Sequence, residues 1–301
     1  MLKIIQKRNI FFTLSGIFVV SSIVALILWG LNFGIDFTGG SLSEIQFPEE
    51  RPVVHEVSDI LTGADLGLDS VVAQPYGDSE MIIRMKVLSE SEHQTYLSVL
   101  RSSYGEGVVE NRFESVGPVI GEELKSKAWM AIAVALIVII IYIAYAFRKV
   151  SRPVASWKYG ISAIIALAHD MLIVTGIFAV LGYFLNIEVG ILFVTALLTV
   201  LGYSVNDTIV VFDRVRENLI YRPKETFVET VNCSVNETLV RSINTSVTTL
   251  LVLGSLYLFG GATIREFVLV LIIGAIAGTY SSIFIASPLL IVWQKLKRKR
   301  K

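Results

Sequence analysis

Six long apolar stretches constrain this chain more than any other feature. They cover residues 10–31, 129–147, 159–185, 189–212, 247–259 and 267–293, the fifth with a polar lead-in. A helix needs about 20 apolar residues to cross a hydrocarbon core of about 30 Å. Hydrophobic residues make up 53% of the 301 residues and gather in these blocks, unlike those of a soluble core. The sequence therefore predicts a polytopic α-helical membrane protein with six transmembrane helices.

The first apolar stretch resembles a secretory signal peptide, because Lys3, Lys7 and Arg8 precede it. Its apolar part is longer than that of a signal peptide, and no Ala-x-Ala cleavage site follows it. We therefore predict a retained signal-anchor helix.

Basic residues near the span ends predict the orientation. Four clusters would face the cytoplasm: Lys3, Lys7 and Arg8; Arg148, Lys149, Arg152 and Lys158; Arg214, Arg216, Arg222 and Lys224; and the tail 295–301. The turns on the opposite side, 186–188 and 260–266, contain one basic residue, Arg265. Because cytoplasmic loops are enriched in Lys and Arg, both termini are predicted to be cytoplasmic. The basic tail is interpreted as a membrane-surface anchor rather than a nucleic-acid patch, so no nucleic acid is expected as a partner.

The segment between the first two spans predicts one soluble domain. Strands are expected at 41–47, 70–74, 81–87 and 108–116, with a turn at 75–78. Helices are expected at 53–61 and from a capping box of Ser89 and Glu92 to about Arg101. The order β-α-β-β-α-β predicts an α+β ferredoxin-like domain, on the extracytoplasmic side.

The predicted organisation has four parts. They are a cytoplasmic N-terminus with the first transmembrane helix at 1–35, the extracytoplasmic ferredoxin-like domain at 36–123, a five-helix transmembrane region at 124–294 and the basic cytoplasmic tail at 295–301. The single cysteine, Cys233, excludes an intramolecular disulfide. Nothing in the soluble domain indicates catalysis, and no catalytic residue, metal or cofactor is predicted.

Asn206 and Asp207 form a polar pair inside the fourth apolar stretch. Counting about 1.5 Å per residue from Val189 places Asp207 in the inner half of the bilayer. A carboxylate at membrane depth marks an ion or proton pathway by default. The alternative is a residue near the inner end of the span whose side chain reaches water. We favour a proton relay.

The third stretch contains a second titratable pair, His169 and Asp170. His169 is suited to relay protons, because the ordinary pKa of histidine lies near neutrality. A structural polar contact between helices, worth about 1 kcal/mol in membranes, explains the pair equally well. Both interpretations stay open, and both residues are candidates for the relay.

Arg241 precedes the fifth span on a polar helical face. Thr245, Thr248 and Thr249 share that face, because they follow Arg241 at helical spacing. Arg241 is thus the natural counter-charge for Asp207, and Thr245 and Thr249 continue the polar face into the membrane. The alternative is that Arg241 is one more positive-inside residue.

Several motifs together carry a family resemblance. They are residues 33–40, Phe-Gly-Ile-Asp-Phe-Thr-Gly-Gly; 114–118, Glu-Ser-Val-Gly-Pro; 168–170, Ala-His-Asp; 202–208, Gly-Tyr-Ser-Val-Asn-Asp-Thr; 213–218, Asp-Arg-Val-Arg-Glu-Asn; and 238–246, Thr-Leu-Val-Arg-Ser-Ile-Asn-Thr-Ser. In this order and spacing they resemble SecF, the family of smaller subunits of the SecDF protein-export complex in the RND superfamily. Residues 206–218 are the most specific part.

The resemblance implies a protein translocase subunit of the bacterial inner membrane. With SecD supplying the complementary six-helix half, it would use the proton-motive force to assist export of a polypeptide through the SecYEG channel. YajC and YidC are further partners that it implies. The family's intramembrane relay would fall on Asp207 and Arg241 here.

Three alternatives belong to other classes. Asp170 and Asp207 lie in consecutive spans, as in intramembrane aspartyl proteases, but the sequence lacks a Gly-x-Gly-Asp motif. An RND-type small-molecule exporter would have larger external domains. A passive scaffold would leave the membrane charges unexplained. The coupled ion also stays open, since carboxylates and hydroxyls bind sodium as well as protons.

Overall fold

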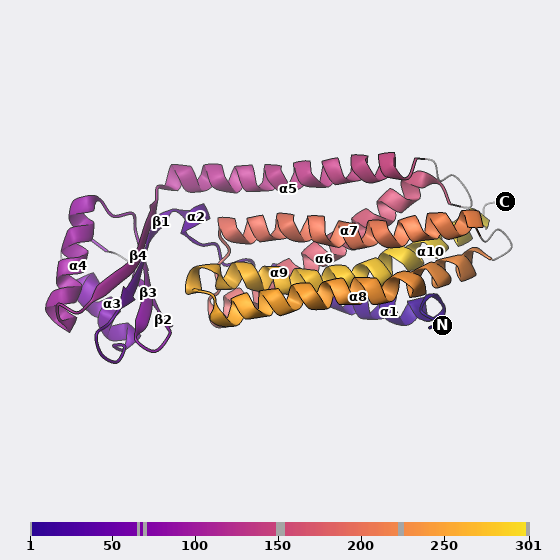
Figure 1. Ribbon diagram of the computed structural model, residues 1–301. Helices are drawn as coiled ribbons and strands as arrows, with labels where there is room; N and C mark the ends of the chain where they lie inside the picture. The colour runs from indigo at the N-terminus through magenta and orange to yellow at the C-terminus, as the bar shows by residue number, and fades with distance from the viewer. Residues whose placement is uncertain (1, 65–66, 69–70, 149–153, 222–225, 299–301) are drawn as a thin grey trace. The chain divides into compact units, whose positions relative to one another are not determined.

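The computed structural model describes residues 2–64, 67–68, 71–148, 154–221 and 226–298. The chain divides into two compact units (Figure 1). One comprises Met1–Asn32 and Met130–Lys301, and the other is Phe33–Trp129.

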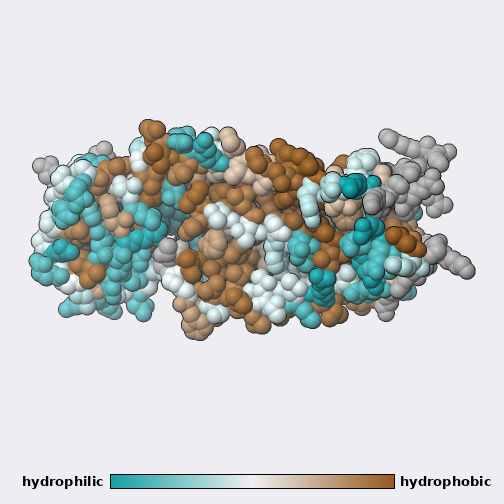
Figure 2. Space-filling view, turned by 45° about the horizontal axis from the view of Figure 1, so that its top comes forward, coloured by the Kyte–Doolittle hydropathy of each residue, from teal (hydrophilic) through white to brown (hydrophobic). Residues whose placement is uncertain are grey.

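The described residues contain six helices that are long and apolar enough to cross a membrane, which confirms the predicted number. They are η1 and α1 (Ile5–Lys7, Arg8–Leu28), α5 (Pro118–Ala146), α6 (Ser156–Leu185), α7 (Ile191–Tyr221), α8 (Phe227–Phe259), and a sixth made of α9 (Ala262–Ser281), the π-helix η2 (Ser282–Ala286) and α10 (Ser287–Arg298). Figure 2 shows a largely hydrophobic surface over these helices and hydrophilic surface at the end where the chain termini lie.

Helices α7 and α8 extend well beyond the apolar stretches from which they were predicted. Their polar ends pair with each other: Arg214 Nε donates to Glu237 at 2.6 Å, and Asn218 Nδ2 donates to Ser234 at 2.9 Å. A capping box at Thr226 begins α8. These side-chain contacts satisfy polar groups that hydropathy alone would assign to a loop, so the helices continue past their apolar stretches.

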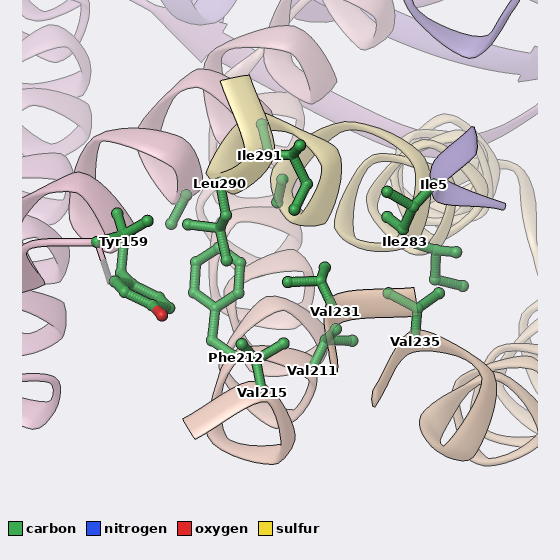
Figure 3. Packing of buried hydrophobic residues seen from close by; sticks show 14 of the residues in the cluster. Ile5, Tyr159, Val211, Phe212, Val215, Val231, Val235, Ile283, Leu290 and Ile291 are labelled. Carbon is green, nitrogen blue, oxygen red and sulfur yellow. The ribbon is translucent and has the colours of Figure 1, made fainter. Parts of the chain in front are cut away.

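The core of the helical unit lies where α6, α7, α8 and the sixth span meet (Figure 3). Its fully buried side chains include Tyr159, Phe212 and Leu290. The Tyr159 and Phe212 rings meet edge to face with centroids 5.3 Å apart. Aromatic and branched side chains therefore fix how these helices pack.

Both chain ends lie at the same end of the helical unit (Figure 1). Asn232 on α8 accepts from the backbone N–H of Ile5 and donates to the Leu2 carbonyl, which ties the N-terminal turn to α8. Several residues used to predict orientation lie outside the described residues: Lys149, Arg152, Arg222, Lys224 and the tail 299–301. The side of the membrane on which the termini lie stays a prediction.

The second unit contains the expected ferredoxin-like domain. Its elements are α2 (Ile35–Thr38), β1 (Gly40–Gln46), α3 (Val54–Gly63), β2 (Val72–Tyr76), β3 (Glu80–Met85), α4 (Glu90–Tyr104) and β4 (Val109–Val116). The sheet is antiparallel in the order β2-β3-β1-β4, with α3 and α4 as the two crossovers. The predicted fold class is therefore confirmed.

One turn in this unit differs from the prediction. Pro75 and Tyr76 were placed in a turn, but they extend β2 and pair with Met81 and Glu80 of β3. Proline cannot donate to a strand ladder, so it is confined to sheet edges. Strand β2 is an edge strand, which is why Pro75 is accommodated.

Gly39 and Gly40 form the corner at which β1 begins. Their φ angles are +74° and +132°, which residues with a Cβ rarely adopt. A Cβ at Gly39 would lie 2.9 Å from the Cα of Pro118. The glycines thus permit both the turn and the close approach of the backbone where α5 begins.

Candidate functional site: a polar seam inside the helical unit

Three polar residues of α7 project from one side of that helix into the bundle. Ser204, Asp207 and Thr208 are three or four positions apart, so they share a face. All three are buried, and Asp207 is 6% exposed. An apolar helix therefore carries one carboxylate and two hydroxyls to its packed face.

Asp207 lies against α8. Arg241 and the Ser242 hydroxyl are the α8 groups that interact with it electrostatically. Asp207 Oδ2 and Ser242 Oγ are both buried, and neither has a hydrogen-bond partner among the residues that the structure describes. No ion pair within 4.0 Å joins Asp207 to Arg241 in the described part of the chain. The pair predicted from the sequence stays a prediction, with Arg241 on the expected neighbouring helix.

The other predicted relay residues of α7 and α8 face away from the helical unit's interior. Asn206, Arg241 and Thr245 are exposed, and Thr249 is half-buried. The Thr245 carbonyl accepts from Thr249 Oγ1 at 2.9 Å within the same helix. The inward face of α8 instead carries Ser242 and Ser246, which are buried. The predicted polar face of α8 therefore exists, but it points outward from this chain.

His169 and Asp170 form a separate buried cluster on α6. His169 Nδ1 lies 3.0 Å from Asp170 Oδ1. Asp170 Oδ2 accepts from Ser204 Oγ of α7 at 2.6 Å and from Ser281 Oγ of α9 at 2.7 Å. Among the described residues, the hydrogen-bond partners of the Asp170 carboxylate are His169, Ser204 and Ser281, and Asp207 is not one of them.

Sequence reasoning missed the serines and threonines of this seam. Ser204 and Thr208 of α7 meet Ser281 and Ser282 of the sixth span, and Thr208 Oγ1 lies 2.8 Å from Ser282 Oγ. Ser246 Oγ of α8 lies 2.5 Å from Thr279 Oγ1 of α9. The available signal was the spacing of hydroxyl residues at four positions within apolar runs, a pattern typical of interhelical hydrogen bonds.

Among the described residues, no group of three or more His, Cys, Asp or Glu side chains gathers as a metal site would require. Thus the seam offers isolated carboxylates with hydroxyl neighbours. Such a site can take up a proton or a monovalent cation and can change its interhelical hydrogen bonds when it does so.

Comparisons with known proteins identify the family. The model for the C-terminal region of the protein export membrane proteins SecD and SecF matches residues 97–296, and the model for the SecD/SecF GG motif matches residues 30–47. The protein translocase subunit SecF of Thermobaculum terrenum is 45% identical, covering 98% of this chain and 94% of that relative. SecF of Anaerolinea thermophila is 40% identical, with 98% and 94% covered.

Solved structures agree with these relatives. The crystal structure of SecDF, a translocon-associated membrane protein from Thermus thermophilus, matches with a TM-score of 0.83 and 33% identity. The match covers 97% of this chain, which spans 38% of the length of that SecDF chain. SecDF in a super-membrane-facing form matches with a TM-score of 0.71. The protease and small-molecule exporter alternatives gain no support. The chain is a multi-pass membrane protein and belongs to the SecF family of protein translocase subunits.

Proposed function

We propose that this chain works with a SecD half as a proton-driven subunit that assists polypeptide export through the Sec channel. The observation that carries the proposal is Asp207, a carboxylate buried in a membrane span with one oxygen unpartnered and Arg241 on the adjacent helix. Relatives named as translocase subunits, and a solved SecDF chain of which this chain covers 38%, support it.

The proposed relay has two states. In one, Asp207 is protonated and neutral, and in the other it is ionised and paired with Arg241. One charge that crosses the membrane potential releases about 2.3 kcal/mol per 100 mV, enough to drive a conformational step of a few kcal/mol. Because Asp207 lies where α7 packs on α8, the change of charge would alter the contact between these helices.

The outward polar face of α7 and α8 supports a partner in the membrane. Arg241 is exposed in this chain alone, as are Asn206 and Thr245. A guanidinium facing lipid at a span is costly, so a second helical half is expected to cover it. We propose that SecD covers this face, and that Asn206, Thr245 and Thr249 line the route by which protons reach Asp207.

The location and remaining partners follow from the same proposal. The chain would lie in the bacterial inner membrane with both termini cytoplasmic and the domain at 36–123 outside. There the domain would hold an emerging polypeptide during the cycle. SecYEG is the proposed channel partner, with YajC and YidC as accessory partners.

The test is the export rate at a fixed proton-motive force in vesicles that contain the complex. Asp207→Asn keeps the shape and removes titration, so it should abolish the stimulation of export by the proton-motive force. Arg241→Ala should impair export about as severely, whereas Arg241→Lys should keep partial activity, because lysine retains the charge without the planar donor fork.

The matched control is Arg216→Ala. Arg216 pairs with Asp213 at the polar end of α7, so its removal takes away a basic residue but no proposed relay group. Wild-type export in Asp207→Asn would exclude the relay. Wild-type export in Arg241→Ala would leave Arg241 as a topological residue only. Replacing the proton gradient by a sodium gradient of equal size identifies the coupled ion.

A further inference from the structure

The Asp170 carboxylate has hydrogen-bond partners at both oxygens. It is 0% exposed, and its partners come from three helices: His169 on α6, Ser204 on α7 and Ser281 on α9. The two serine hydroxyls donate to the same oxygen at 2.6 and 2.7 Å. These distances are typical of hydroxyl donors on an ionised carboxylate.

Asp207 is arranged in the opposite way. Its Oδ2 has no hydrogen-bond partner among the described residues, and the nearby Ser242 hydroxyl is also unpartnered. A new proton on Asp170 Oδ2 would have to displace a serine donor, and one on Oδ1 would compete with the His169 contact, whereas Asp207 Oδ2 has no partner to displace among the described residues. The two buried carboxylates are therefore suited to different tasks. Asp207 is suited to exchange a proton, and Asp170 is suited to hold neighbouring helices together.

Helices α7 and α9 are unusually close beside Asp170. A Cβ on Gly278 would lie 2.8 Å from the Cβ of Ser204, and one on Gly274 would lie 2.6 Å from Cγ1 of Val200. The absence of side chains at these glycines lets Ser204 and Ser281 reach the same carboxylate oxygen.

The π-helix η2 begins directly after Ser281. Its first residue, Ser282, lies 2.8 Å from Thr208 Oγ1, and its carbonyl accepts from Ser287 Oγ at 3.0 Å, five residues on. The wider turn lets the adjacent Ser281 and Ser282 both face α6 and α7, a local irregularity typical of functional sites.

We propose that Asp170 is a positioning residue for the relay. The hydrogen bonds that its ionised carboxylate accepts from Ser204 and Ser281 link α7 and α9 to α6, and Ser204 lies one helical turn from Asp207. These hydrogen bonds set the position in which Asp207 exchanges its proton. The inference rests on the proposed function, since it assigns a task relative to Asp207. Among the described residues, the titratable groups that the contacts place at Asp170 are His169 on its own helix and Tyr280 of α9, whose ring stacks on His169 with centroids 6.2 Å apart. Asp207 is three positions from Ser204 on α7.

The test uses the complex with SecD in liposomes and measures proton flux with an internal pH dye across a range of external pH. The decisive variant replaces both Ser204 and Ser281 by Ala and keeps Asp170 itself. Loss of these two hydrogen bonds should lower the proton flux about two- to thirtyfold and shift the midpoint of the flux–pH profile. Asp170→Asn should act in the same direction and to a similar extent. Thr175→Ala is the matched control, since among the described residues this α6 hydroxyl donates only to backbone carbonyls of its own helix, and it should leave flux and midpoint unchanged.

Two results would overturn the proposal. If Asp170 carries the proton itself, the serine variant keeps nearly wild-type flux while Asp170→Asn loses all of it. If the cluster only stabilises the fold, both variants lower the amount of folded complex, while flux per folded complex and its midpoint stay at the wild-type values. Should the double variant fail to fold, Ser281→Ala alone is expected to shift the midpoint in the same direction. Asp207→Asn separates the two proposals: full flux in that variant refutes the relay, whatever Asp170 does.

Discussion

Replacing Gly176 by alanine should separate α1 from α6. Gly176 lies on α6 against Ser22 of α1, and a Cβ at Gly176 would lie 2.5 Å from the Ser22 Cα. Carbon atoms pack at about 3.5–4.0 Å, so the helices must part by about 1 Å. Because the obstacle is backbone, no rotamer change relieves it.

The magnitude follows from two opposing terms. Overpacking costs about 1–3 kcal/mol, and the backbone clash favours the upper end. Alanine gains about 1 kcal/mol over glycine within a helix. The net loss of unfolding free energy is therefore about 2 kcal/mol.

The assay is unfolding of the purified protein by sodium dodecyl sulfate in mixed micelles, followed by circular dichroism. Gly16→Ala on α1 is the matched control, because nothing lies within 4 Å of a Cβ there. The control should be unchanged or more stable by up to about 1 kcal/mol. Equal stability of the two variants would refute the close α1–α6 packing.

Three further predictions concern the ferredoxin-like unit. Ser89→Ala removes the capping box of α4 and should lower unfolding free energy by about 1 kcal/mol in thermal melts. Hydrogen bonds from the Ser89 backbone N–H and hydroxyl lower the pKa of Glu92 from 4.5 to about 2. The stability that the ionised Glu92 contributes is complete above pH 4.5 and is lost as the pH falls toward 2. Glu92→Gln should therefore reduce the loss of stability on acidification in that pH window. Asp78→Cys, at an exposed turn, should be labelled by an impermeant thiol reagent from outside, in a Cys233→Ser background; labelling only after permeabilisation would reverse the orientation.

The sequence predicted the features that depend on local pattern. Apolar length identified six spans, since a helix must match the bilayer thickness whatever its neighbours are. Alternation and the Ser89 capping box identified the ferredoxin-like order, because these signals act within a few residues. Asp207 stood out because a carboxylate is costly in hydrocarbon.

The sequence could not supply what depends on contacts between distant segments. The continuation of α7 and α8 past their apolar stretches depends on pairs such as Arg214 with Glu237. The placement of Pro75 in a strand depends on β2 lying at the sheet edge. Ser204 and Ser281 are 77 positions apart and inconspicuous alone, and only the fold brings both to Asp170.

The central claim is that Asp207 is the group that exchanges the transported proton. The most direct measurement is proton flux through the SecD-containing complex in liposomes under an imposed pH gradient, for wild type and for Asp207→Asn, with equal protein insertion verified. The account predicts flux in the wild type and background leakage in Asp207→Asn, while Arg216→Ala retains wild-type flux. Undiminished flux in Asp207→Asn would contradict the account.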